Sequence, residues 1–448
     1  MTTLTPLEPW IRRKIGLPAT EHLNRPALEE YQLRRLRETV GYAICHSPFY
    51  RDRLGGLSEV DIVTLADLGR FPFTYSADIC KDDLRFLCVS QREIERVVTL
   101  KSSGTTAPSK RLHFTAEDLE QTVDFFHHGM STLVGPGDRV LILMPGELPG
   151  SVGDLLVKGL FRMDLEGIVR WPLGETEGLL DFIASKGITS LVGLPGHLLR
   201  VVRHPKAAQL TKGQIGSVLL SADYVPEAVV RELKRVWGCL VFNHYGMTEM
   251  GLGGGVDCRA LSGYHLREVD LLFEIVDPVD GRPLPEGETG EVVFTTLTRK
   301  GMPLIRYRTG DMASFITESC TCGAVLRRLG HVRGRLETMV EIAGCYRLDC
   351  SDLSESLYSV PEIIDFQAEL SRYDGTDLLA LTILLCNAAG KDTIGRVKTA
   401  LMDIPQIRDA NACGKFIVDP IFSTDDAGFP QGTTKKTILD LRQGGSKK

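Results

Sequence analysis

One stretch of the chain, residues 217–246, most constrains what this sequence can fold into. Residues 217–221 (SVLLS) predict a buried strand, and residues 226–238 (PEAVVRELKRVWG) predict a helix that a proline opens and a glycine closes. Residues 239–246 (CLVFNHYG) predict the next strand. A strand, a helix and a strand in this order are typical of a parallel α/β sheet. Short β-rich runs alternate with helical stretches from about Thr99 onward, which extends this pattern.

The pattern changes downstream, which predicts a second architecture. The runs FEIVDP and GEVVFTTL, joined through the turn Asp280-Gly281, predict an antiparallel hairpin within residues 273–297. After about Arg335 short helical and strand patterns form an α+β set. A chain of 448 residues exceeds the size of one ordinary core. We therefore expect an α/β protein with a large N-terminal domain, residues 1–334, and a small α+β domain, residues 335–448.

Charge and hydropathy exclude several classes of protein. The formal net charge of -6 leaves no strongly basic field that would capture a nucleic acid. No apolar run reaches the length of a membrane span, and the first residues lack the apolar stretch of a secretory leader. We therefore expect a cytoplasmic protein without a nucleic-acid or membrane partner. Its eleven cysteines are then expected to be free thiols or metal ligands rather than disulfides.

Residues 99–115 (TLKSSGTTAPSKRLHFT) are the strongest local candidate for a binding site. A strand runs into a cluster of small hydroxyl residues with a glycine, a lysine and an arginine. Such a loop can surround a phosphate chain with backbone N–H groups, hydroxyls and an ammonium. The alternative is a polar surface turn. The sequence contains no Gly-x-x-x-x-Gly-Lys-Ser/Thr element, so this is not the usual phosphate loop of nucleotide-hydrolysing enzymes.

Two further motifs follow predicted strands. In HYGMTE, Tyr245, Thr248 and Glu249 come directly after a strand, where open α/β sheets bind ligands. The ring could stack on a base, the hydroxyl could meet a phosphate and the carboxylate could hold magnesium. PLIRYRTGD ends in Asp311, whose carboxylate could accept both hydroxyls of a ribose. Alone, each motif would more often be an ordinary strand end or turn.

These motifs together resemble a known family. SSGTTAPSK, HYGMTEMG, RYRTGD, GRLETM and the late lysines follow the order and spacing of the acyl-adenylate-forming superfamily of acyl-CoA synthetases and luciferases. SPFYRDRL, PLIRYRTGD and a cysteine cluster make the chain most similar to the phenylacetate–CoA ligases. The resemblance implies a large multi-subdomain adenylating domain and a small mobile C-terminal domain. It also implies activation of an aryl or arylacetic acid as acyl-AMP with release of pyrophosphate, then transfer to coenzyme A.

Other outcomes stay open at this point. The acyl group could pass to a carrier-protein thiol or to an amine, or the chain could be a nucleotide-binding homologue without catalysis. The sequence does not identify the acid, and a homodimer stays open as well. The cofactors that the resemblance implies are ATP, Mg²⁺ and coenzyme A.

The resemblance assigns roles to individual residues. Thr248 would contact the α-phosphate, Glu249 would ligate Mg²⁺ and Glu337 would lie at the hinge between the domains. Gly344 would come to the thiol entrance. The residues implied in ATP binding are Ser102, Ser103, Gly104, Thr105, Thr106, Lys110, Ala222, Asp223, His244, Tyr245, Gly246, Asp311 and Arg335. Asp223 stands where the family usually has glutamate, and Ala107 where glycine is commonest, but neither change removes a group that the chemistry needs.

The adenylation lysine is harder to place, because the Gly-Lys pair of the family is broken in QGTTKKTILDLR. Lys435 or Lys436 could take this role. We favour Lys435 from its distance to Leu441-Arg442. The alternative is that both lysines only solvate a tail.

A cysteine and histidine cluster predicts a structural zinc site. Cys320 and Cys322 form a tight pair before a glycine, and Cys258 and His265 lie upstream in one segment. Three thiolates and one imidazole suit a closed tetrahedral Zn²⁺ site, which would place zinc in a β region at about residues 256–330. His331 is the alternative fourth ligand. The alternative to a zinc site is a set of buried free cysteines.

Overall fold

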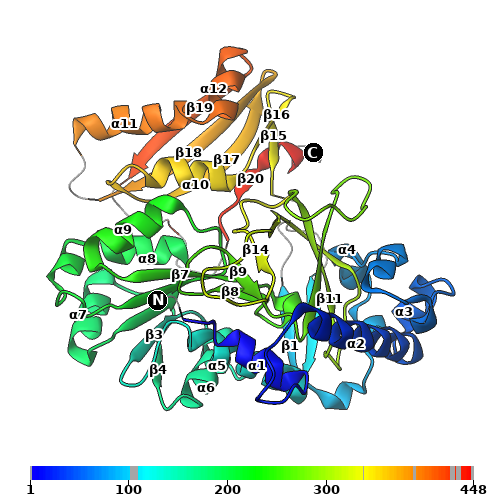
Figure 1. The fold of residues 1–448 in the computed structure, drawn as a ribbon. Coiled ribbons are helices and arrows are strands. Elements are labelled where there is room, and N and C mark those ends of the chain that lie inside the picture. The colour runs from blue at the N-terminus through cyan, green and yellow to red at the C-terminus, as the bar shows by residue number, and fades with distance from the viewer. Residues whose placement is uncertain are drawn as a thin grey trace. The chain divides into compact units, whose positions relative to one another are not determined.

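Figure 1 shows the fold in a computed structural model, which describes residues 3–100, 109–336, 338–386, 390–423, 429 and 435–444. The chain forms two compact units, each built from three segments. The first unit comprises Met1–Asp138, Gly146–Val169 and Phe242–Val332, and the second comprises Arg139–Pro145, Arg170–Val241 and Arg333–Lys448. Helices and strands occur in both units, so the mixed α/β fold expected from the sequence is confirmed. Separate movement of residues 335–448 stays a prediction.

The first unit begins with helices. Asn24 caps α2 (Arg25–His46), because its side chain accepts a 3.0 Å hydrogen bond from a backbone N–H of the first turn. The buried face of α2 carries Leu36, Val40 and Ala43, which pack into the core of this unit. The other described helices of this unit are α1 (Leu7–Lys14), α3 (Pro48–Arg53), α4 (Ser76–Lys81), α5 (Ala116–Met130) and α6 (Val152–Phe161).

Antiparallel strands of the first unit carry most of the candidate site. β10 (Leu271–Val276), β11 (Gly290–Thr296) and β12 (Tyr307–Ala313) form one sheet, which confirms the predicted hairpin. β8 (Gly255–Asp257) pairs with both β7 (Leu240–Tyr245) and β9 (Tyr264–Leu266). The remaining described strands are β1 (Ile94–Leu100), β2 (Lys110–Thr115), β4 (Glu166–Val169), β13 (Phe315–Ile316) and β14 (Arg328–Leu329).

The second unit contains the parallel strands predicted from the sequence. β5 (Ser190–Gly193) pairs in parallel with both β3 (Arg139–Leu143) and β6 (Ser217–Leu220). The predicted helix after β6 is α9 (Glu227–Trp237), and Gly238 ends it in the left-handed conformation at φ 69°. Two more helices of this part are α7 (Thr176–Lys186) and α8 (Pro195–Arg203).

A mixed sheet organises the C-terminal part of the second unit. β17 (Ile363–Tyr373) pairs antiparallel with β18 (Thr376–Leu385) and parallel with β20 (Ile438–Asp440), and β18 pairs parallel with β19 (Phe416–Ser423). β20 therefore brings the late lysines to the β17 edge of this sheet. The other elements are β15 (Val340–Ile342), β16 (Tyr346–Leu348), α10 (Cys350–Tyr358), α11 (Lys391–Met402) and α12 (Pro405–Ala412).

Candidate active site

A tight turn after β7 places a buried carboxylate at the end of that strand. The chain passes through Gly246 into a short 3-10 helix, Thr248–Met250. A Cβ at position 246 would lie 2.5 Å from the carbonyl oxygen of Leu252, so the turn needs glycine here. Glu249, inside this helix, is only 2% exposed. The local sequence HYGMTE thus produces a carboxylate directly after a strand, as the motif suggested.

The carboxylate of Glu249 has two close partners from distant parts of the chain. The ammonium of Lys110, the first residue of β2, forms an ion pair with it. The hydroxyl of Tyr307, at the start of β12, donates a 3.1 Å hydrogen bond to the same carboxylate oxygen. Lys110 also donates to the Tyr307 hydroxyl at 3.1 Å. The sequence indicated Lys110 and Glu249 but gave no sign of Tyr307.

Arg299 binds the main chain of Glu249. Its guanidinium donates a 2.6 Å hydrogen bond to the carbonyl oxygen of Glu249 and lies over the ring of Phe114. Burial lowers the pKa of Arg299 to about 10, which still leaves the side chain charged at neutral pH. Arg299 was not predicted, because nothing in its local sequence marks a contact with a residue fifty positions away.

The two residues predicted to contact adenosine lie together. The Tyr245 hydroxyl donates a 3.0 Å hydrogen bond to Asp311, which is 3% exposed. The ring of Tyr245 stacks on Tyr264, with 5.6 Å between the ring centroids and 30° between the planes. An aromatic face beside a carboxylate offers a base platform and an acceptor for hydroxyl groups.

Asp257, the last residue of β8, contacts two residues that neighbour the tyrosine pair. Its carboxylate accepts a 2.8 Å hydrogen bond from the Asn243 backbone N–H and bonds His331 Nε2 at 3.0 Å. The His331 ring also lies 4.8 Å from the ring of Tyr264. His331, the alternative zinc ligand, is therefore engaged by Asp257 and does not belong to the cysteine cluster.

His244 sits in an aromatic environment next to Tyr245. The rings of Phe125 and Phe126 lie 6.1 and 6.2 Å from its ring. Burial lowers the pKa of His244 to about 4, so the imidazole is neutral near pH 7. This cluster is aromatic and uncharged.

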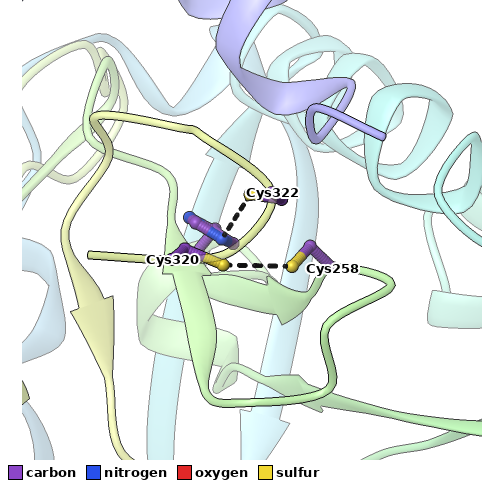
Figure 2. Close-up of side chains that lie close together, drawn as sticks. Cys258, Cys320 and Cys322 are labelled. Atoms are coloured by element: carbon purple, nitrogen blue, oxygen red, sulfur yellow. Dashed lines mark hydrogen bonds between the residues drawn. The ribbon is translucent and has the colours of Figure 1, made fainter. Parts of the chain in front are cut away.

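The predicted cysteine and histidine cluster is brought together in the first unit (Figure 2). Cys258 Sγ lies 3.6 Å from Cys320 Sγ, and Cys322 Sγ lies 3.4 Å from His265 Nε2. All four ligand atoms lie within 4.8 Å of one another, and all four residues are buried. Tetrahedral Zn²⁺ would place two thiolate sulfurs about 3.8 Å apart and a sulfur and a nitrogen about 3.6 Å apart. The donor set and its spacing fit zinc.

A second histidine group was not predicted. Asp124, His127 and His128 in α5 also lie within 4.8 Å of one another, from an Asp-x-x-His-His spacing that a search for helical metal ligands could find. Arg13 Nη2 bonds His128 Nε2 at 3.1 Å, and Lys14 lies 3.7 Å from the Asp124 carboxylate. Two cations already occupy this group, so it is less suited to a metal ion.

In the second unit, Asp223 forms hydrogen bonds that include one with the backbone of the segment carrying Lys435 and Lys436. Its carboxylate accepts a 2.9 Å hydrogen bond from Tyr224 N and a 3.1 Å hydrogen bond from Lys436 N. Burial raises the pKa of Asp223. Ala222, the residue before it, has a left-handed φ of 71°, which is uncommon for a residue with a Cβ.

The two lysines differ in their surroundings. The ammonium of Lys436 forms an ion pair with Asp365 and donates a 2.9 Å hydrogen bond to the carbonyl oxygen of Phe366. Lys435 has an exposed side chain. Both lysines and Asp223 line a cavity of about 240 Å³.

Besides the contact of Lys436 N with Asp223, other hydrogen bonds within the second unit join residues 170–241 to residues 333–448, and the sequence did not predict them. Arg203, at the end of α8, donates a 2.6 Å hydrogen bond to the carbonyl oxygen of Tyr358. The Tyr224 hydroxyl donates a 2.6 Å hydrogen bond to Glu355 in α10. Each partner lies more than a hundred residues away, so no local pattern could reveal the pair.

The remaining predicted residues are only partly described. The carbonyl oxygen of Arg335 accepts hydrogen bonds from Thr338 N at 3.2 Å and from Thr338 Oγ1 at 3.1 Å, which close a turn in the linker. Several predicted site residues lie outside the described residues: Ser102, Ser103, Gly104, Thr105, Thr106 and Glu337. Within the described parts of the chain, no helix combines the length and the apolar character that crossing a bilayer requires.

Comparison with known proteins identifies relatives in sequence. The AMP-binding enzyme family model matches residues 95–297. A phenylacetate–coenzyme A ligase of Thermus thermophilus is 29% identical over 374 residues, which cover 80% of this chain and 81% of the relative. The enzyme of the same name from Escherichia coli is 27% identical over 373 residues, covering 80% and 82%.

Solved structures share the fold. A 2-hydroxyisobutyryl-CoA ligase in the postadenylation state, in complex with an acyl-AMP, has a TM-score of 0.80 at 19% identity, covering 96% of this chain and 95% of that chain. The anthranilate CoA ligase AuaEII, in complex with anthranoyl-AMP, has a TM-score of 0.56 at 15% identity, covering 76% and 65%.

Proposed function

We propose that the chain belongs to the acyl-adenylate-forming superfamily, within which it is phenylacetate–CoA ligase-like, and that it is an ATP-dependent carboxylic acid–CoA ligase. The acid is activated as acyl-AMP with release of pyrophosphate, and the acyl group is then passed to coenzyme A. The observation that carries this proposal is the buried carboxylate of Glu249, on which Lys110 and Tyr307 converge. The Tyr245 and Asp311 pair comes from the same two strands, because Tyr245 ends β7 before Glu249 and Asp311 lies on β12 with Tyr307.

The chemistry explains why this site needs charge rather than a protein nucleophile. A carboxylate is a poor acyl donor, because its leaving group would be oxide. Attack of the acid on the α-phosphate of ATP gives a mixed anhydride with AMP as a good leaving group. Stabilising the negative charge on the phosphates is therefore the main task, and preorganised charges do this well.

In the proposed site each residue has one task. Tyr245 lies against adenine, Asp311 accepts the ribose hydroxyls and Thr248 contacts the α-phosphate. Glu249 holds Mg²⁺, which is commonly bound through one or two carboxylates together with substrate phosphates. When bound, Mg²⁺ neutralises charge on the phosphates. The single buried carboxylate at this turn fits that mode of binding.

We assign adenylation to Lys435, with Lys436 as the alternative. The Lys435 side chain is exposed, whereas that of Lys436 is only 21% exposed; both lysines line the cavity. This difference supports Lys435 as the lysine that contacts the α-phosphate. Asp223 fixes the backbone beside both residues.

Thioester formation requires different groups at the same carbonyl. Residues 335–448 are proposed to turn about the linker at residues 334–337, which brings Gly344 to the thiol entrance. Hinges of this kind are a few residues that absorb the backbone change.

The cysteine and histidine cluster is proposed to hold a structural Zn²⁺. Cys258, Cys320, Cys322 and His265 supply four ligands, which closes the coordination shell and leaves no position for substrate. Burial lowers the pKa of His265 to about 4, so the imidazole is neutral, as a metal ligand must be. None of the eleven cysteines forms a disulfide in the structure, which supports a reducing, cytoplasmic location.

An aryl or arylacetic acid is the proposed substrate class. Phe125, Phe126 and neutral His244 form an aromatic cluster at the end of β7. A Cβ at Gly253 would lie 2.3 Å from the Phe125 ring, so the glycines after Glu249 allow this ring to reach the turn. An aromatic, uncharged cluster favours a flat, uncharged acyl group.

Mass spectrometry of the products tests this function. Incubation with ATP, Mg²⁺, coenzyme A and a panel of carboxylic acids should yield one or more acyl-CoA thioesters together with AMP. If acyl-AMP forms without a CoA thioester and instead reacts with a carrier-protein thiol or an amine, that group rather than coenzyme A is the acceptor.

A further inference from the structure

The ammonium of Lys110 sits among three oxygen atoms. It donates to Ser76 Oγ at 3.1 Å and to the Tyr307 hydroxyl at 3.1 Å, and it forms the ion pair with Glu249. The side chains of Lys110 and Glu249 are only 14% and 3% exposed. An ammonium thus occupies an oxygen-lined position against the carboxylate that is proposed to hold the metal.

The Lys110 ammonium and a divalent cation exclude each other at Glu249, because both are positively charged. A buried carboxylate without a counter-charge is costly, so the ammonium stabilises Glu249 in the absence of ligands. A divalent ion on the same carboxylate would lie a few ångströms from the ammonium, and like charges at that distance in a buried site repel strongly. Lysine is a point charge on a flexible four-carbon stem, so it can leave one anion for another.

We propose that Lys110 is the resident counter-ion of Glu249, and that Glu249 binds a divalent cation only after Lys110 has transferred to the phosphate chain of ATP. This rests on the proposed function for the identity of the nucleotide. Three consequences follow for the metal. The protein alone does not hold it at Glu249, the metal and the nucleotide bind together, and removing the ammonium opens the site to free metal.

Titration of Mn²⁺ without nucleotide, with free Mn²⁺ measured by electron paramagnetic resonance, tests this. The wild-type protein and Glu249→Gln should bind Mn²⁺ alike. Lys110→Met should gain one site that binds Mn²⁺ about tenfold or more tightly, and the double variant Lys110→Met, Glu249→Gln should lose it. Lys110→Arg, which keeps the charge, should not gain it.

Lys158→Met is the control. Lys158 also places its ammonium on a carboxylate, that of Asp154 at 2.8 Å, in an exposed ion pair on α6. This variant should gain no Mn²⁺ site. A gain of the same size would show that the effect is not specific to Glu249, and would overturn the proposal.

Two other results would contradict the proposal. One is a folded Lys110→Met protein whose Mn²⁺ affinity equals that of wild type. The other is wild-type protein that already binds Mn²⁺ without nucleotide and loses this binding in Glu249→Gln, a comparison that needs no Lys110 variant. These titrations measure Mn²⁺ binding and do not depend on acyl-CoA synthesis. If the protein made no acyl-CoA, the proposed function would be refuted, but the Mn²⁺ titrations would still test the role of Lys110.

Discussion

The ring of Tyr264 stacks on Tyr245 with 5.6 Å between centroids, and Tyr264 directly precedes His265 of the cysteine and histidine cluster. On the paired strand, Asp257 supports His331 and the backbone of Asn243, and it directly precedes Cys258. Proposed zinc ligands and residues around the proposed adenine platform thus alternate along the same hairpin. Order at the metal should therefore be transmitted to the nucleotide site.

Loss of the metal is predicted to weaken both stability and ATP binding. The double variant Cys320→Ser, Cys322→Ser should purify without stoichiometric zinc and melt at least about 5 °C lower, because a structural metal contributes directly to folding. Its Kd for ATP by calorimetry should rise several-fold. Cys345→Ser, at an exposed thiol, is the control and should change neither value. Full zinc content in the double variant would refute the metal site.

Glu249→Gln should abolish acid-dependent adenylation while the protein stays folded, because the metal loses its charged ligand. We expect a loss of about a hundredfold or more in rate, as for other removed charges at reacting phosphates or oxyanions. Glu288→Gln, at an exposed position, should retain the wild-type rate. Unchanged adenylation in Glu249→Gln would remove Glu249 from the site.

Lys435→Ala should separate the two half-reactions. The lysine is needed while charge builds on the α-phosphate but not when the thiol attacks, so adenylation should fall by about a hundredfold or more. Thioester formation from supplied acyl-AMP should survive far better. Lys436→Ala should mainly reduce stability, since it removes the closest cationic partner of Asp365 and leaves only Arg200, at 4.0 Å. The reverse pattern, with adenylation lost only in Lys436→Ala, would shift the assignment by one residue.

The contacts of Arg203 and Tyr224 with residues 333–448 predict that variants at these two positions affect adenylation and thioester transfer unequally. If residues 335–448 move during the reaction, these hydrogen bonds exist in one arrangement and break in the other. Because the same arrangement places Lys436 N on Asp223, Arg203→Met and Tyr224→Phe should slow adenylation several-fold more than thioester transfer. Arg231→Met, at an exposed position of α9, serves as the control. Equal losses in both half-reactions would contradict this.

Stability should fall as the pH is lowered from about 6.5 to 4. Burial lowers the pKa of His244 and of His197 to about 4, whereas the unfolded chain has the ordinary value of 6.5. The unfolded state therefore binds more protons in this window, and the free energy of unfolding falls with pH by roughly 3 kcal/mol at most for each residue. Urea unfolding of wild type and His244→Phe at pH 7 and pH 5 measures this. The variant should lose less stability between the two values.

Local patterns predicted much of the fold. The helix over residues 227–237 and the hairpin of β10 and β11 depend on periodicity and on turn residues within a short stretch. The cysteine cluster was predicted for a similar reason, because thiol pairs and a nearby histidine have recognisable spacing.

Long-range pairing set the limit of prediction. Tyr307 reaches Glu249 across 58 residues and Arg299 reaches it across 50, through contacts that the packing of β12 and the turn after β7 create. Neither residue carries a local motif for this role. The engagement of His331 by Asp257 likewise depends on the pairing of β9 with both β8 and β14, because β8 carries Asp257 and His331 follows β14.

Acid-dependent exchange of labelled pyrophosphate into ATP tests the central claim most directly, because it reports reversible acyl-AMP formation without a thiol. Wild-type protein with Mg²⁺ should catalyse exchange only when an acid of the correct class is present, and Glu249→Gln should not. ATP binding without acid-dependent exchange over a broad panel of aryl, arylacetic and aliphatic acids would contradict the account and favour a nucleotide-binding protein without this catalysis.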